Sequence, residues 1–438
     1  MLIKYNMIFF RMKLQFLILG LLIFLSINGL ASSKVVVMPL MNGVYRENIH
    51  SVQFFREGWD FSQPIIELGA ADQRIQLKFD ELSDGVTNFV YRVTHCDEEW
   101  YPSRLVQSEY MEGFMENPIN DYAASINTTT KYTNYLLSLP NENVRFLVSG
   151  NYLLSVFEEG KKDSPVLTRR FYVVEPLADI KGEVKKSTFE GFKGRDQEID
   201  FDMTYSRIGI QDPRTEIKVV VMQNSRTDNC LTKLKPLFVR DNQLSYDLSR
   251  ENVFAGGNEF RNFDTKNLRI NGLGVANIEF IRPLYHVTLR TDLVTRGSEY
   301  RNENDLNGRY LIKNDRVTDS DLESDYMKVY FSLEMAEPLL GGNIYVFGGL
   351  SDWQCLPVNK MTWNPELKLY EAALLLKQGF YDYQYVYVEN GGSLIDNTLL
   401  EGSYVDTEND YQILVYYRGF SSRYDRLIGY RTINSVKR

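Results

Sequence analysis

His95, Cys96 and the acidic residues that follow them are the residue types from which an enzyme could build a base, a nucleophile and an orienting acid. They end a run in which Phe89, Tyr91 and Val93 recur at every second position. Neighbouring residues on a strand point to opposite faces, so the side chains of His95 and Cys96 cannot meet without a sharp bend. We therefore interpret His95 as continuing the apolar face, Cys96 as a buried thiol, and the acids as part of a turn.

Other catalytic and cofactor-binding patterns are missing from the sequence. It has three histidines, which lie far apart, and it lacks the HExxH, GxSxG, GxxxxGK and GxGxxG motifs. Asp305 and Asn307 offer oxygen ligands for calcium, but their spacing differs from that of an EF-hand loop, and a solvated acidic segment is the simpler interpretation. We predict no catalytic residue, no cofactor and no metal site, and we expect a protein that is not an enzyme.

The amino terminus has the pattern of a secretory signal peptide over residues 1–31. Three basic residues precede the apolar run Leu14 to Leu25, and a small-residue cleavage site ends at Ala31. The run is short for a membrane-spanning helix, which needs about 20 apolar residues. We expect an exported protein with a cleaved signal.

Composition narrows the class of partner. The formal net charge is −9, and loss of residues 1–31, which carry three basic and no acidic side chains, would change it to −12. Such a chain is a poor nucleic-acid binder, because phosphate contacts rely on Lys and Arg. Cys96, Cys230 and Cys355 lie in different parts of the sequence, and we interpret them as separate thiols rather than a disulfide framework.

Alternation with period two is the dominant pattern along the chain. Ile75, Leu77 and Phe79 form one such series, and a tyrosine series from Tyr381 to Tyr387 forms another. Runs of this kind between Gly, Asn and Asp predict antiparallel strands. We expect an all-β protein of tandem immunoglobulin-like β-sandwich domains.

Domain boundaries are placed where the alternation stops. The strand pattern before Glu175 and Pro176 ends a first domain, and an acid-rich stretch from Lys313 to Asp325 has the composition of an exposed linker. The predicted segments are a first sandwich at 32–178, a middle β domain at 179–312, a linker at 313–325, a third sandwich at 326–420 and a tail at 421–438.

The third segment has a motif of its own, from Ile344 through Trp353 and Trp363 to the Gly379–Tyr383 strand. It resembles the early-set immunoglobulin-like sandwich of the family-48 starch- and glycogen-binding modules. That resemblance implies an alternative function, an exported carbohydrate-binding protein in which Trp353 or Trp363 is a stacking platform for a glycan. The motif is largely fold-determining, so it favours a sandwich more than sugar binding.

A second resemblance runs through the whole mature chain. Residues 95–105 read HCDEEWYPSRL, and further matches include GGNEFR at 256–261, DLNG at 305–308 and TENDY at 407–411. These segments resemble the type IX secretion system plug protein family of Bacteroidota, whose motif is YxHCDADWxPSxL. The frequent YTHY of that family is YTNY here, so a histidine at that position is dispensable.

The resemblance implies a periplasmic protein that docks on the outer-membrane SprA-type translocon barrel and closes its periplasmic opening when no cargo is engaged. It implies association with the outer membrane through the translocon and no direct insertion into the membrane. Tyr and Arg favour protein interfaces. The predicted partner contacts are Trp100, Tyr101, Arg104, Tyr110, Phe114, Arg261 and Phe263.

Some of these residues, and the arginines near the carboxyl end, have an alternative interpretation as structural residues. Trp100, Tyr110 and Phe114 could instead be core residues that close the end of a sandwich. The arginines near the carboxyl end, Arg418 and Arg426 among them, could pair with the chain's own acids.

Overall fold

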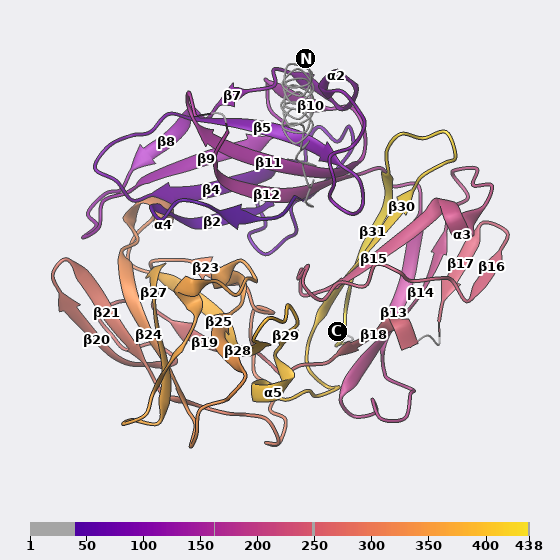
Figure 1. Cartoon of the computed structure of the whole chain (residues 1–438). Helices are drawn as coiled ribbons and strands as arrows, with labels where there is room; N and C mark the ends of the chain where they lie inside the picture. Colours follow the sequence, from indigo (N-terminus) through magenta and orange to yellow (C-terminus); the bar gives the residue numbers. More distant parts are fainter. Residues whose placement is uncertain (1–39, 162, 248–249, 437–438) are drawn as a thin grey trace, which may run out of the picture. The chain divides into compact units, whose positions relative to one another are not determined.

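A computed structural model describes residues 40–161, 163–247 and 250–436 of the chain. The predicted signal peptide at 1–31 lies outside the described residues. Within them the regular secondary structure is almost entirely β-strand, which confirms the predicted all-β class of tandem sandwiches (Figure 1). No described helix is long and apolar enough to cross a membrane.

The first hydrophobic core lies between two sheets formed by residues 43–174. Alternation explains it, because Ile75, Leu77 and Phe79 are fully buried, and Phe89 and Tyr91 face them from the opposite sheet. One sheet has the order β1 (Gly43–Val44), β12 (Pro165–Val174), β11 (Gly150–Glu158), β5 (Phe89–Cys96), β7 (Asn117–Pro118), with β3 (Ile65–Glu67) on β12. The other has the order β2 (Ile49–Arg56), β4 (Ile75–Glu81), β9 (Thr133–Leu139), β8 (Asp121–Ala124). A short helix, α2 (Gln107–Tyr110), leads into β6 (Met111–Gly113), which pairs with β10 (Val144–Phe146).

The second core combines the middle of the chain with its carboxyl end. One sheet contains β13 (Asp179–Lys186), β14 (Asp196–Thr204), β17 (Gln243–Tyr246) and β16 (Phe238–Arg240), with β18 (Val253–Ala255) on β14. The facing sheet has the order β15 (Ile217–Gln223), β30 (Asp410–Tyr417), β31 (Arg426–Asn434). The short helices α3 (Pro213–Glu216) and η1 (Arg250–Asn252) lie in the connections. Phe201, Val219 and Ile413 meet between the two sheets.

The third core is formed by residues that lie between β18 and β30 in the sequence. Its six-stranded sheet contains β20 (Val275–Ile281), β21 (Leu284–Leu289), β24 (Tyr326–Glu334), β27 (Leu369–Lys377) and β26 (Thr362–Asn364), with β22 (Asp292–Leu293) on β24. The other strands gather on β28 (Gly379–Glu389): β19 (Arg261–Asp264), β23 (Tyr310–Ile312), β25 (Gly342–Phe347) and β29 (Ile395–Asp396). Four short helices are α4 (Ser320–Glu323), α5 (Thr398–Glu401), η2 (Gly349–Ser351) and η3 (Pro357–Asn359).

These pairings divide the chain differently from the predicted segments. Strands β19 to β23 come from the predicted middle domain, yet they pack in the third core. Strand β30 from the predicted third sandwich and β31 from the predicted tail complete the second core. Alternation identifies strands locally, whereas pairing between distant strands is set by the whole fold. The third sandwich is thus inserted into the second.

The acidic stretch 313–325 is a packed connection rather than an exposed linker. Asp321 pairs with Lys78 at 2.7 Å, and Asp325 accepts hydrogen bonds from the backbone and hydroxyl of Thr129. Beside it, Lys377 of β27 and Asp80 of β4 form a buried ion pair at 2.6 Å. The segment therefore fastens the first core to the third.

Candidate partner-docking surface

The HCDEEW segment folds as a strand end followed by a tight turn. His95 is buried in the first core, where its ring packs edge-on against Tyr152, with 4.9 Å between the ring centroids. Its Nε2 lies 3.3 Å from the carbonyl oxygen of Ser149, and burial lowers the pKa of His95 to about 4. Cys96 points to the opposite face of β5, and burial raises the pKa of its thiol to about 12. A neutral imidazole and a protonated thiol on opposite faces do not form a nucleophile and base.

Trp100 occupies the turn in a left-handed conformation, with φ of 69°. The carboxylate of Asp97 accepts hydrogen bonds from the backbone of Glu99 and Tyr101, which fixes the turn. The indole packs against Tyr172, and the guanidinium of Arg170 lies 4.2 Å from the centre of one of its rings. Trp100 belongs to a small core that joins β11 and β12 to β15, β30 and β31. The core interpretation holds for Trp100, and Tyr101 next to it is half-buried.

A cluster of charged residues lies at the junction between the first and second cores. Glu98 pairs with Lys218, and its backbone N–H donates to Asp425 at 3.3 Å. Asp425 also pairs with Arg418 at 3.4 Å, and Arg426 pairs with Glu175 at 2.8 Å. Burial raises the pKa of Glu98 to about 7, and the Lys218 ammonium opposes this shift.

The arginines near the carboxyl end therefore pair with the chain's own acids, which was the predicted alternative to a contact with a partner. Arg423 in the turn between β30 and β31 does so as well, through Glu109 of α2. That ion pair holds the turn beside α2.

Exposed apolar side chains lie close in the sequence to both partners of this contact. Val106, Phe114 and Met115 are 63%, 76% and 62% exposed, and Phe420 in the β30–β31 turn is fully exposed. Gln107 ties the segment together, because its side-chain amide donates to the carbonyl of Gly113 at 2.9 Å. We call Arg104, Val106, Phe114, Met115 and Phe420 the α2 surface. Large apolar side chains exposed together mark a site of protein contact more often than a free surface.

The α2 surface contains two of the predicted contact residues. Arg104 and Phe114 are exposed. Tyr110 is buried in the first core and donates a hydrogen bond to the carbonyl of Val93 at 3.1 Å. Val106, Met115 and Phe420 were missed by sequence reasoning, and the signal for Phe420 is its place between Gly and Ser in a turn.

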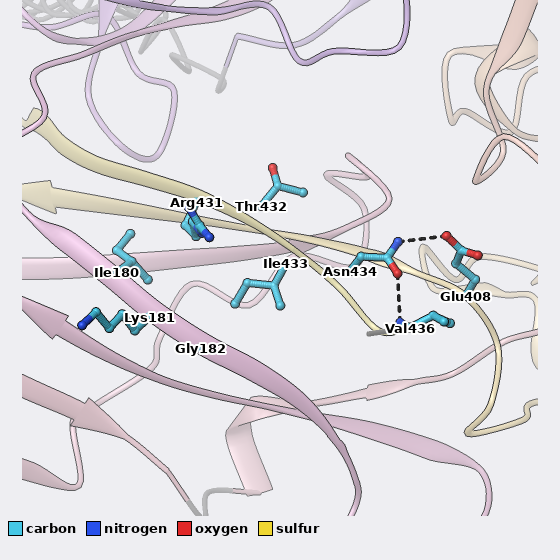
Figure 2. A pocket seen from close by; sticks show the side chains of 9 residues that line it. All are labelled: Ile180, Lys181, Gly182, Glu408, Arg431, Thr432, Ile433, Asn434 and Val436. Atoms are coloured by element: carbon cyan, nitrogen blue, oxygen red, sulfur yellow. Dashed lines mark hydrogen bonds between the residues drawn. The ribbon is translucent and has the colours of Figure 1, made fainter. Parts of the chain in front are cut away.

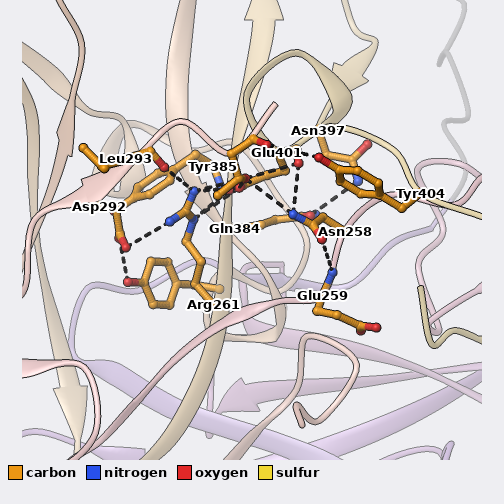
Figure 3. Close-up of polar contacts among 12 residues, drawn as sticks. Asn258, Glu259, Arg261, Asp292, Leu293, Gln384, Tyr385, Asn397, Glu401 and Tyr404 are labelled. Carbon is orange, nitrogen blue, oxygen red and sulfur yellow. Dashed lines mark hydrogen bonds and ion pairs between the residues drawn. The ribbon is translucent and has the colours of Figure 1, made fainter. Parts of the chain in front are cut away.

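Arg261 and Phe263 correct the predicted contact surface, because Phe263 belongs to the third core and the half-buried Arg261 is held in a polar network beside it (Figure 3 shows Arg261). Phe263 is fully buried and stacks on Tyr381. Arg261 pairs with Glu401 at 2.8 Å and with Asp292 at 3.0 Å, and it donates to the carbonyl of Leu293.

The carboxylates around Arg261 are held from their other sides. Tyr383 and Tyr385 donate to Asp292, and Thr295 donates to Glu401. Burial disfavours the charged guanidinium, but Glu401 raises the pKa of Arg261 above its usual range. This network has no group left over for a partner, and its role is to hold β19, β22, β28 and α5 together.

The two tryptophans proposed as a glycan platform lie against the fold. Trp353 packs edge-on against Phe260 and Phe347, and the guanidinium of Arg226 lies 5.6 Å from the centre of one of its rings. Trp363 packs against Tyr370 on the third core. Stacking on a sugar requires an open ring face, and these contacts give no support to that alternative.

The described surface also contains hollows. A groove of about 590 Å³ between β13 and β31 is lined by Lys181, Arg431 and Asn434 among others, and Asn434 donates to Glu408 at 3.1 Å (Figure 2). Another cavity, of about 580 Å³, lies beside the ion pair of the buried Arg169 and the partly exposed Asp352. In the described part of the chain, no cluster of three or more His, Cys, Asp or Glu residues could hold a metal ion. The oxygens of Asp305 accept hydrogen bonds from the backbone of Phe260 and Asn307.

Together, the fold and the packed HCDEEW turn define a class of tandem β-sandwich proteins. The exposed apolar side chains of the α2 surface suit contacts with another protein. The model of the type 9 secretion system plug protein 1st domain matches residues 49–175. The crystal structure of a hypothetical protein from Parabacteroides merdae ATCC 43184 is 39% identical, covers 91% of this chain and 100% of that chain, and has a TM-score of 0.88. No curated protein matches. The chain therefore belongs to the family of the Parabacteroides protein, and its first core is a type 9 secretion system plug protein first domain.

Proposed function

We propose that the chain is the periplasmic plug subunit of the type IX secretion system. In this proposal it docks on the SprA-type translocon barrel of the outer membrane and closes the periplasmic opening when no cargo is engaged. The observation that carries the proposal is the family match over 49–175, which spans the first core. A barrel that passes folded cargo needs a closing subunit, and a rigid, non-catalytic β protein suits that task.

The α2 surface is the proposed contact with the barrel. It presents apolar side chains and a cation, Arg104, at one end of the first core. Interface cores are rich in aromatic residues, Met and Arg, and this surface supplies all three. Its two segments are in contact through the exposed Arg423–Glu109 pair.

The test is recovery of the translocon barrel with the tagged mature chain from detergent-solubilised outer membranes, quantified for the wild type and for variants. We expect Phe114→Ala and Arg104→Ala to lower recovery about tenfold or more, since hot-spot side chains contribute about 2 kcal/mol or more each. Both side chains are exposed, so the melting temperature should stay unchanged.

Arg145→Ala is the matched control, because Arg145 is also exposed and lies in β10, which pairs with β6. Failure of the wild-type chain to retain the barrel, while folded and abundant, would refute the proposed function. Equal recovery of the barrel by the wild type and all variants would remove the α2 surface from the contact. Conductance of the reconstituted barrel with and without the chain then tests closure.

A further inference from the structure

Strand β20 forms one end of the six-stranded sheet in the third core and pairs with β21 on one side. After an irregularity at Ala276, residues 277–281 continue in regular register. Asn277, Glu279, Phe280 and Ile281 are exposed. A strand paired on one side presents a row of unpaired N–H and C=O groups on the other, which can accept a further strand.

Other sheet edges in the described residues are short, covered or interrupted, and the longer edge strands β15 and β25 each carry an isolated bridge to a neighbouring segment, at Leu231 and Lys360. Strands β1 and β7 have two residues each, and β8, β16 and β26 have three or four. The edges of β13 and β31 face each other, so that a Cβ at Gly182 would lie 2.7 Å from Ile433. The edge strand β2 is interrupted at Ser51, where φ is 50°. Residues 277–281 of β20 are neither faced by another strand on the open side nor interrupted in their pairing with β21.

Apolar residues surround this open edge. Ile270 and Leu273 in the preceding loop are 64% and 62% exposed, and Phe280 and Ile281 are 44% and 50% exposed. The backbone N–H of Asp264, at the end of β19, donates to the carbonyl of Leu273, so the loop is tied to β19 just before β20 begins. The edge therefore offers side-chain contacts as well as backbone groups.

The charge around the edge is positive, although the chain as a whole is acidic. Arg269 and Arg290 lie near the start of β20 and Arg282 follows its end, and all three are exposed. Among the described residues none of them has a carboxylate within 4.0 Å, and the strand itself contributes one acid, Glu279. A partner strand with acidic and apolar residues would complement these three cations.

We propose that β20 accepts an extended acidic and apolar segment of the translocon as an additional strand. This inference rests on the proposed function and gives the plug a second contact, made through backbone hydrogen bonds. A second copy of the chain fits less well. Two β20 strands paired about Glu279 would set their carboxylates opposite each other, and like charges directly opposite destabilise a sheet.

The experiment compares Ile281→Glu with Ile281→Lys in the full mature chain, by affinity for the purified, detergent-solubilised translocon. Both changes remove the same apolar side chain, so a difference between them reports the sign of the partner's charge. We expect Ile281→Glu to weaken binding at least tenfold and Ile281→Lys to weaken it less. Leu367→Glu, at an exposed position in a different turn, is the control for the added charge. Hydrogen exchange at residues 277–281 should slow in the complex.

The outcomes separate the two proposals. One outcome is that the wild type binds the translocon, both Ile281 variants bind it as tightly as the wild type does, and hydrogen exchange at 277–281 does not change in the complex. The β20 inference is then overturned and the proposed function stands. If the wild type does not bind, the proposed function fails and the inference fails with it. Dimerisation of the free chain that Ile281→Glu abolishes, measured by sedimentation, would overturn the inference in favour of a second copy.

Discussion

Arg104 and Phe114 in the first core unit have the same residue types as Arg261 and Phe263 in the third, but their environments are opposite. The first pair is exposed beside α2, whereas the second pair is enclosed by Asp292, Glu401 and aromatic rings. An exposed Arg and aromatic residue can form a contact with a partner, while the same residues in a core hold strands together. Residue type alone therefore does not distinguish a docking surface from a structural network.

The sharpest test of this contrast is Arg261→Ala. The change leaves the buried Glu401 and the half-buried Asp292 without their cation, and breaking a buried pair in this way costs about 3–5 kcal/mol. We expect the free energy of unfolding in urea to fall by that amount and translocon binding to fall only as the folded fraction falls. Arg104→Ala should leave stability unchanged. A stable Arg261→Ala chain with lost binding would return Arg261 to the contact surface.

A second test concerns Glu98, which is half-buried at the junction of the first and second cores. Its pKa is about 7 in the folded chain and 4.5 in a model peptide. Between these values the folded state binds more protons than the unfolded state, so this residue lowers stability as the pH rises. The free energy of unfolding of Glu98→Gln, relative to that of the wild type, should therefore increase by about 1–3 kcal/mol between pH 4.5 and pH 8, since one pKa unit is about 1.4 kcal/mol.

The measurement is urea unfolding at several pH values, with Glu99→Gln as the control. Glu99 is the neighbouring acid and is exposed. A stability difference between wild type and Glu98→Gln that does not change with pH would contradict the assignment.

The strands were predictable because period two is a local property. Ile75 to Phe79 and Tyr381 to Tyr385 point into cores, as the alternation predicted. The pairing of β15 with β30 was not predictable, because it joins distant segments through contacts that no local pattern records. The insertion of one sandwich into another therefore remained hidden.

The candidate site was predictable in part. Partial burial of Arg261 has a signal in the sequence, since it stands two residues before Phe263 and so shares a face with an aromatic core residue. Exposure of Phe114 has no such signal, because it lies outside the strands, where alternation gives no face, and for Phe420 the neighbouring Gly and Ser indicate only a turn. The HCDEEW segment marks the family, yet it packs inside the fold, so motif recognition located the family and not the surface.

The smallest expected effect is that of Arg145→Ala. Arg145 and Glu112 are 69% and 54% exposed, and exposed pairs contribute about 0–1 kcal/mol because water and salt screen them. Arg145 and Arg261 both lie on strands, and both form ion pairs with carboxylates. They therefore differ mainly in burial. The stability of Arg145→Ala should match the wild type in urea at 0.5 M salt. A loss of several kcal/mol there would mean that burial does not separate structural arginines from surface ones in this chain, and the assignment of Arg104 to the docking surface would lose its basis.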